Sequence, residues 1–344
     1  MIYDRMNSIL EQSSIDEMDS LFESIMHDLE NIDIEIPLQK GVTESMLNRH
    51  NIMKGSIMYS LFEQEAFDTS NAQDVEYKDV DDKSNNNNNN DNNSEPEINT
   101  KKDSFFKKFS NSLKLILDKF IELIKKAVMF FSEKIFNNDK FLKEHQKELE
   151  EALRKTPTIE GKIPSISIKS IENGEDSYFT KIANENLTKY AIKMNMKYLQ
   201  EGKKIDAFAF VCKQYSFGRG EDLYSVLQVV REKFLDPNRG KKGTIKLEES
   251  KEIIDKYGRD YVKFLKEQIG EIKKQRANVD SDVSSIARLN KEGHQIAVAV
   301  ARCSYTTSIN IHKEVITIMR QGIGEHERIL KSAILKNSNS KSEK

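Results

Sequence analysis

The chain has 344 residues, of which 32% are charged and 37% hydrophobic, a high and a low share for a compact globular protein. Only five prolines and fourteen glycines interrupt it, which argues against β-rich folds that depend on many tight turns. The composition therefore predicts an all-α protein, an elongated helical bundle with coiled-coil-like helices, rather than one large core.

The net charge of −2 conceals two parts of opposite sign. Residues 1–100 carry a net charge of −16, and residues 101–344 carry +14. This polarity favours attraction between the two parts, within one chain or between chains. Basic residues are interleaved with acidic ones throughout, so we do not expect nucleic acid as a sequence-specific ligand.

Targeting signals are not evident in the sequence. The N-terminus is acidic and has no continuous apolar segment of the kind found in secretory signal peptides. No run approaches eighteen uncharged apolar residues, so no transmembrane segment is predicted. Cys212 and Cys303 stand far apart without CxxC spacing, which favours a reducing, intracellular origin.

Residues 1–67 are predicted to form an acidic helical N-terminal region. Apolar residues recur at three- and four-residue intervals over residues 1–31, as in an amphipathic helix, before Pro37 and Gly41 interrupt it. A second helix is predicted from Thr43 to Phe62, although the eight residues 55–62 also fit a buried strand. Residues 68–103 are acidic and Asn-rich with few apolar side chains, and are predicted to be a disordered linker.

Residues 104–155 are predicted to form a long basic amphipathic helix. Lysines occupy the side opposite to an apolar face, which repeats with alternating steps of three and four residues. We expect this face to pack on another helix, and an interfacial membrane helix is the alternative. The face includes Phe106, Phe109, Leu113, Ile116, Phe120, Ile124 and Phe131.

Residues 156–235 are predicted to be a small central helical subdomain, with a loop or minor strand at residues 163–171. Residues 236–245, which include the sequence DPNRGKKGT, are predicted to be a linker. Residues 337–344 are predicted to be a disordered tail.

Residues 246–336 are predicted to contain two or three long helices with a heptad seam. Apolar residues lie seven apart near the C-terminus, and His312 and His326 fall among the companion positions three residues later. Such a seam is typical of coiled coils, so we predict that it joins copies of the chain. The predicted oligomer seam is Ile309, Ile316, Met319, Ile323 and Leu330.

No motif of catalysis or cofactor binding is evident, and we predict a non-enzymatic protein without catalytic, cofactor-binding or metal-binding residues. The six histidines form no HExxH motif and no tight pairing with cysteine. The sequence YSFGRGEDLY, residues 215–224, lacks the third glycine of a dinucleotide-binding loop and fits a turn between two helices. The basic sequence NRGKK, residues 238–242, could touch phosphate but fits a solvated loop better.

The sequence FFKKFSNSLKLILDKFIELIKKAVMFFSEKIFNNDKFLKEHQKELEEA, together with the Asn-rich tract and the heptad-bearing C-terminus, resembles structural or internal virion proteins of large tailed bacteriophages of low-GC hosts. The resemblance covers roughly residues 101–155 and 246–336. It implies a virion or internal head protein that is present in many copies and has no catalytic residues.

The leading hypothesis is therefore a structural protein that assembles through amphipathic helices, with copies of itself or other virion proteins as partners. It would be located in the virion if phage-encoded, and otherwise in the host cytoplasm. One alternative is a peripheral protein whose helix 104–136 binds lipid. Another is an acidic scaffold that recruits a partner through residues 1–65.

Overall fold

The computed structural model describes residues 2–30, 96–174, 207–288 and 291–342 of the chain. Within these residues the protein is all-α apart from one two-stranded sheet, as the sequence predicts. The elements in chain order are α1 (Ile2–Glu30), α3 (Pro96–Glu144), α4 (Gln146–Lys155), β1 (Thr158–Lys162), α7 (Ala207–Tyr215), α8 (Leu223–Phe234), β2 (Lys242–Lys246), α9 (Leu247–Glu252), the π-helix η2 (Ile253–Tyr257), α10 (Gly258–Ala287) and α11 (Lys291–Ser342).

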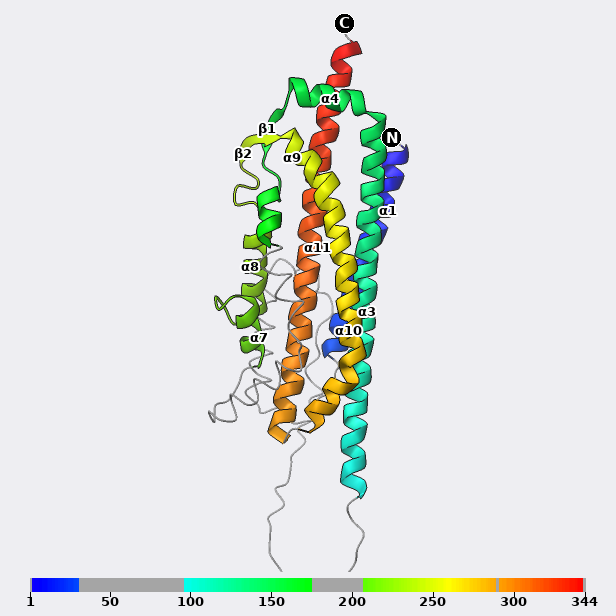
Figure 1. Ribbon diagram of the computed structural model, residues 1–344, viewed down its shortest axis with the longest axis vertical. Helices are drawn as coiled ribbons and strands as arrows, with labels where there is room; N and C mark the ends of the chain where they lie inside the picture. Colours follow the sequence, from blue (N-terminus) through cyan, green and yellow to red (C-terminus); the bar gives the residue numbers. More distant parts are fainter. Residues whose placement is uncertain (1, 31–95, 175–206, 289–290, 343–344) are drawn as a thin grey trace, which may run out of the picture.

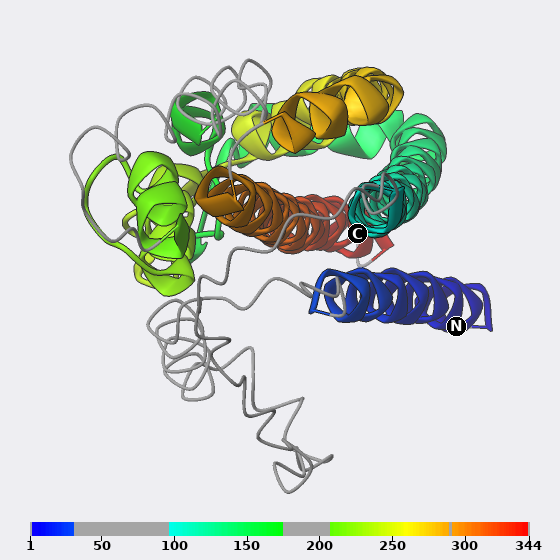
Figure 2. The same cartoon turned by 90° about the horizontal axis from the view of Figure 1, so that it is seen from below.

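Three long helices, α3, α10 and α11, form the centre of an elongated bundle (Figure 1). α3 and α11 run in the same direction, and α10 runs antiparallel to both (Figure 1). α10 lies along α3, α1 lies on the outside of α3 and α11, and α7 and α8 cover another side of α11 (Figure 2). The predicted elongated helical bundle is therefore confirmed.

One apolar core extends along the bundle and receives side chains from every one of these helices. A smaller apolar cluster lies where α4 and α9 meet α11, around Leu149, Leu247 and Leu330. The side chains of α7 and α8, including Val211 and Val230, belong to the large core. The described central helices α7 and α8 thus contribute side chains to the core of the bundle.

The basic amphipathic helix begins earlier than predicted and is interrupted. α3 starts at Pro96, inside the predicted linker 68–103, and a break at His145 separates it from α4. The backbone of His145 is non-helical, with φ −115° and ψ 28°. The break lets α4 turn across the end of the bundle (Figure 1), so that Leu149 and Ala152 reach the smaller cluster.

The sheet corrects two predictions. β2 lies in the predicted linker 236–245 and pairs antiparallel with β1, with Ile159 opposite Ile245. Of the predicted loop or minor strand at residues 163–171, the loop is found at residues 163–167, whereas residues 168–174 are helical and the strand lies before this segment. Buried Ile166 and Ile171 pack on the bundle core, which explains an isoleucine spacing that needs no strand.

The C-terminal helices are confirmed, and α11 continues to Ser342, so most of the predicted disordered tail is helical in the structure. α8 is attached to α11 by a bidentate ion pair as well as by apolar contacts, because Arg231 Nε donates to Glu314 Oε1 at 2.6 Å and Arg231 Nη2 to Oε2 at 3.3 Å. This hydrogen bond with Glu314 raises the pKa of Arg231 above its ordinary value. The predicted second helix at 43–62, and the linker and central helices at 68–95 and 177–206, lie outside the described residues.

Candidate functional site

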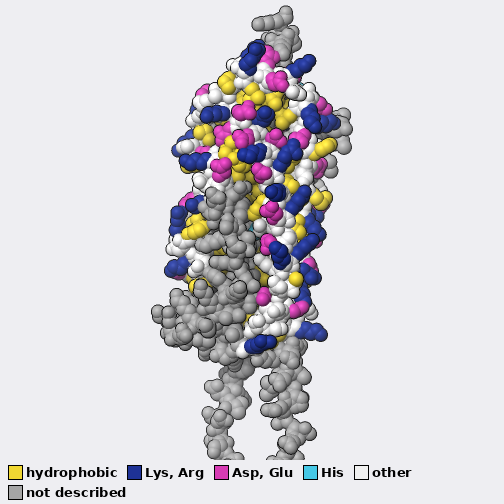
Figure 3. All heavy atoms as spheres, viewed as in Figure 1, with side chains coloured by type: hydrophobic (Ala, Val, Ile, Leu, Met, Phe, Trp, Pro, Cys, Tyr) yellow, Lys and Arg dark blue, Asp and Glu magenta, His cyan; other side chains and the backbone are white. Residues whose placement is uncertain are grey.

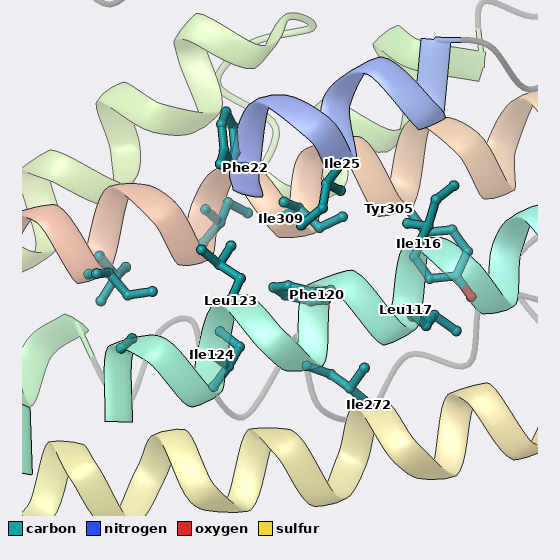
Figure 4. Packing of buried hydrophobic residues seen from close by; sticks show 14 of the residues in the cluster. Phe22, Ile25, Ile116, Leu117, Phe120, Leu123, Ile124, Ile272, Tyr305 and Ile309 are labelled. Atoms are coloured by element: carbon teal, nitrogen blue, oxygen red, sulfur yellow. The ribbon is translucent and has the colours of Figure 1, made fainter. Parts of the chain in front are cut away.

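The predicted packing face of α3 lies inside the bundle. Its seven residues are buried, none of them more than 8% exposed, and they belong to the large core. Figure 4 shows Ile116, Phe120 and Ile124 between the neighbouring helices, with Ile272 pointing from α10 toward α3. Aromatic rings add directional contacts: Phe131 meets the ring of Tyr261 edge to face at 5.0 Å, and Phe120 meets that of His312 at 5.1 Å.

This burial bears on the alternative that helix 104–136 binds lipid. A membrane would have to displace α10 and α11 from the apolar face of α3 before the face could enter lipid. Among the described residues, no helix is long and apolar enough to cross a membrane.

The oligomer seam predicted on α11 has to be corrected. Ile309, Ile316, Met319, Ile323 and Leu330 are at most 6% exposed and lie in the two apolar clusters of a single chain. In the structure these side chains are covered by other helices of the same chain. The heptad spacing is real, but it serves the packing of α11 against α1, α3 and α8 of the same chain.

α1 docks in a groove between α3 and α11, which we call the α1 groove; its walls include Ile116, Phe120 and Leu123 of α3 and Ile309 and Lys313 of α11. The apolar residues of α1 face inward, and Figure 4 shows Phe22 and Ile25 beside Ile309 and Leu123. Over residues 12–29, whose side chains the structure describes, the buried residues of α1 are Met18, Phe22, Ile25 and Leu29. An amphipathic helix thus lies in an apolar groove, which is a common mode of recognition.

Two lysines of α3 hold the edges of α1 through ion pairs. Lys126 Nζ lies 2.6 Å from Glu17 Oε2, and Lys119 Nζ lies 2.6 Å from Asp28 Oδ2 and 2.8 Å from Ser24 Oγ. The hydrogen bond to Glu17 raises the pKa of Lys126 above its ordinary value. The opposite charges of residues 1–100 and 101–344 predict that these two parts attract each other. For α1 and α3, this attraction acts within one chain.

A third cation comes from α11. Lys313 Nζ lies 3.3 Å from Asp19 Oδ1 and 3.8 Å from the centre of the Phe22 ring, where an ammonium is attracted by the π electrons. Asn310 Nδ2 contacts Met26 Sδ at 3.7 Å. Both walls of the α1 groove therefore hold the helix with polar as well as apolar contacts.

The opposite edge of α3 is joined to α10 by further charged pairs. Arg276 donates to both carboxylate oxygens of Asp118, and Lys114 Nζ and Ser110 Oγ donate to Asp280 at 2.6 Å. The hydrogen bonds from Lys114 and Ser110 lower the pKa of Asp280 below its ordinary value. Asp118, which the sequence places in the middle of the polar face, thus contacts α10.

Three large apolar side chains of α3 remain on the outside. Met129 is 70% exposed, Phe136 67% and Leu115 51%. They lie fourteen and seven residues apart, so they follow one line along the outer face of the helix. We call this line the α3 ridge; the charged residues Glu122 and Lys125 lie within and beside it.

The α3 ridge is an exposed apolar feature that the sequence analysis did not identify. The apolar face that was predicted for residues 104–155 is the arc of the helix with the most apolar side chains. Leu115, Met129 and Phe136 lie outside this arc. Their seven-residue spacing was the available signal. On the face in Figure 3, side chains of both charges are otherwise interspersed along the bundle.

Two histidines are buried in the core as neutral side chains. His326 Nε2 lies 2.9 Å from the carbonyl oxygen of Ile166, which can only accept, so this nitrogen carries the proton and Nδ1 accepts from Ser250 Oγ at 2.9 Å. His312 Nδ1 lies 2.8 Å from the carbonyl oxygen of Ser308. Burial lowers the pKa of both histidines below the ordinary value.

The protein should become less stable as the pH falls through about 6.5, where histidines of the unfolded chain take up protons. The folded-state pKa values of His312 and His326 lie below that value, so protonation favours the unfolded state. Their stabilisation is complete above about pH 6.5 and is lost toward the depressed folded values. Urea midpoints at pH 7.5 and 5.5 measure the effect.

A His312→Leu/His326→Gln variant should be less stable overall but show a smaller drop between these two pH values. An equal drop in the wild type and the variant would contradict the assignment to the buried pair.

The remaining sequence signals lie in a turn and a loop. The turn between α7 and α8 is confirmed: Gly218 has a positive φ of 80°, and Asp222 caps α8 by accepting from Ser225 N at 2.7 Å. The basic loop borders a shallow hollow where Arg239 lies near Lys162 and Arg328. No group of three metal-ligating side chains occurs in the part of the chain that the structure describes.

Comparison with known proteins identified no related protein. No family model matches the chain, and neither a curated protein nor a solved structure is significantly similar to it.

Proposed function

We propose that the protein is a non-enzymatic structural protein that assembles with copies of itself or with other proteins through the outer face of α3. The α3 ridge is the observation that carries this proposal. Met129 and Phe136 lie one heptad apart on the same side of α3, so one helix of a partner can cover both of these exposed side chains. The resemblance to phage structural proteins supports the more specific proposal of a virion or internal head component.

The surroundings of the α3 ridge fit a protein partner better than lipid. Glu122 and Glu133 lie on the same outer side of α3 and would be repelled by anionic headgroups. The wide apolar face that interfacial helices need is buried in the core. The α3 ridge itself is a narrow line, with apolar residues at three of four successive heptad positions and Glu122 at the fourth.

A double variant, Met129→Glu/Phe136→Glu, tests the proposal. We expect self-association to weaken at least about tenfold, because two charges would enter the contact, while the circular dichroism spectrum stays unchanged. Sedimentation equilibrium of the full chain measures the association. The matched control is Tyr224→Glu on α8, another half-exposed aromatic side chain, which should leave the association constant unaltered.

Vesicles of phosphatidylcholine and phosphatidylglycerol form the second arm of this experiment. Loss of vesicle binding in the double variant with unchanged self-association would favour the lipid-binding alternative and overturn the proposal. Mass spectrometry of purified virus particles from the source organism tests whether the protein is packaged.

A further inference from the structure

We infer that the α1 groove is a docking site for the α1 helix of a second copy, so that copies exchange α1 and are joined in pairs or chains. The inference deepens the proposed function and rests on its premise that the protein assembles. This contact is separate from the α3 ridge.

The end of α1 and the start of α3 are close together compared with the length of chain that connects them. α1 runs antiparallel to α3, because Glu17 pairs with Lys126 and Asp28 with Lys119. The end of α1 therefore lies near the level of Leu117, about 30 Å along the axis from the start of α3 at Pro96. About ten extended residues would close that distance.

The sequence provides 65 residues, 31–95, for this connection. A chain of that length spans at most about 215 Å, several times the distance within one molecule. Covalent geometry therefore allows α1 to reach the groove of a neighbouring copy as well as its own. A short connection would have made docking within the chain obligatory.

The contacts that hold α1 in the α1 groove can form within one chain or between two chains. α1 is an outer helix of the bundle (Figure 2), held by four buried apolar side chains and by ion pairs along both edges. These contacts are complementary in shape and charge, and each can form identically between chains. Removal of α1 would expose apolar side chains of the groove such as Ile116 and Ile309, so an empty groove favours any α1 that is near.

The balance between docking of α1 within one chain and docking between chains depends on the protein concentration. A long connection holds α1 near its own groove at an effective concentration that is at most millimolar. When other copies are present at a comparable concentration, their α1 helices compete equally with the chain's own α1 for the groove. Exchange is therefore expected to increase with protein concentration, as assembly proceeds.

Cross-linking of the full chain in an equal mixture of ¹⁴N- and ¹⁵N-labelled protein tests the inference. A zero-length carbodiimide joins carboxylates to lysines that they contact, so it links Glu17 to Lys126 and Asp28 to Lys119. Mass spectrometry then separates pairs from one isotope from mixed pairs. We expect the mixed share at Glu17–Lys126 to rise at least about fivefold between micromolar and millimolar protein.

Two ion pairs of the same chemistry serve as controls. Lys134–Glu327 joins α3 to α11, and Lys114–Asp280 joins α3 to α10, both within the bundle that does not exchange. Their cross-links should stay within one isotope at every concentration. Mixed cross-links at these pairs as well would indicate general intermolecular reaction and overturn the inference.

The outcomes separate this inference from the proposed function. Glu17–Lys126 cross-links that never mix, combined with loss of association in Met129→Glu/Phe136→Glu, would overturn α1 exchange and leave assembly through the α3 ridge intact. Mixed cross-links with association unaffected by that double variant would support exchange and overturn the role of the α3 ridge.

Discussion

Replacement of Phe131 by alanine should lower the free energy of unfolding by about 3–5 kcal/mol. The ring is buried and packs edge to face on Tyr261, so its loss leaves a cavity between α3 and α10 and removes the aromatic contact. Equilibrium unfolding in urea, followed by circular dichroism, measures the change.

Met129→Ala is the matched control for this prediction. It lies two residues away on the same helix, and its side chain is largely exposed within one chain, so at protein concentrations too low for self-association we expect a change within about 0.5 kcal/mol. Equal losses at the two positions would mean that the outer face of α3 is covered in solution or that the core does not close around Phe131.

Replacement by alanine should destabilise the protein at one glycine of α11 and stabilise it at another. A Cβ at Gly322 would lie 2.4 Å from side-chain atoms of Ile166, which is buried and whose carbonyl oxygen is bonded to His326. Overpacking of this kind destabilises by about 1–3 kcal/mol. We expect Gly322→Ala to lower the urea midpoint accordingly.

At Gly324 a Cβ would meet only Lys134 Nζ, at 3.9 Å. Gly324→Ala should therefore stabilise the protein by about 0.5–1 kcal/mol, because alanine is the better helix former. The same urea measurement compares both variants. Stabilisation in both would show that the segment around Ile166 does not press against α11.

The sequence predicts the helices because their apolar residues recur with helical spacing. The long arc on α3 and the heptads of α11 both lie in the core, as periodic apolar residues should. Periodicity does not identify the partner of a face, and this explains the error over the oligomer seam. Ile309 and Ile323 face neighbours that are distant in sequence, and nothing in a heptad distinguishes those from a second chain.

The α3 ridge and the sheet were missed for a different reason. Leu115, Met129 and Phe136 are sparse, and they become conspicuous only when α1 and α10 are seen to leave that side of α3 uncovered. β2 has the sequence KGTIK, too short and too charged for a strand signal on its own. It becomes a strand because β1 lies beside it.

The two strands have a consequence for the architecture of the chain. Ile163 N donates to the carbonyl oxygen of Lys241, and Gly240 N to that of Ile163, just past the paired strands. The intervening residues 163–241 thus leave and return at one point, like an insertion with adjoined ends. The separation of α4 from α9 is therefore set by the paired strands and not by the path of the chain between them.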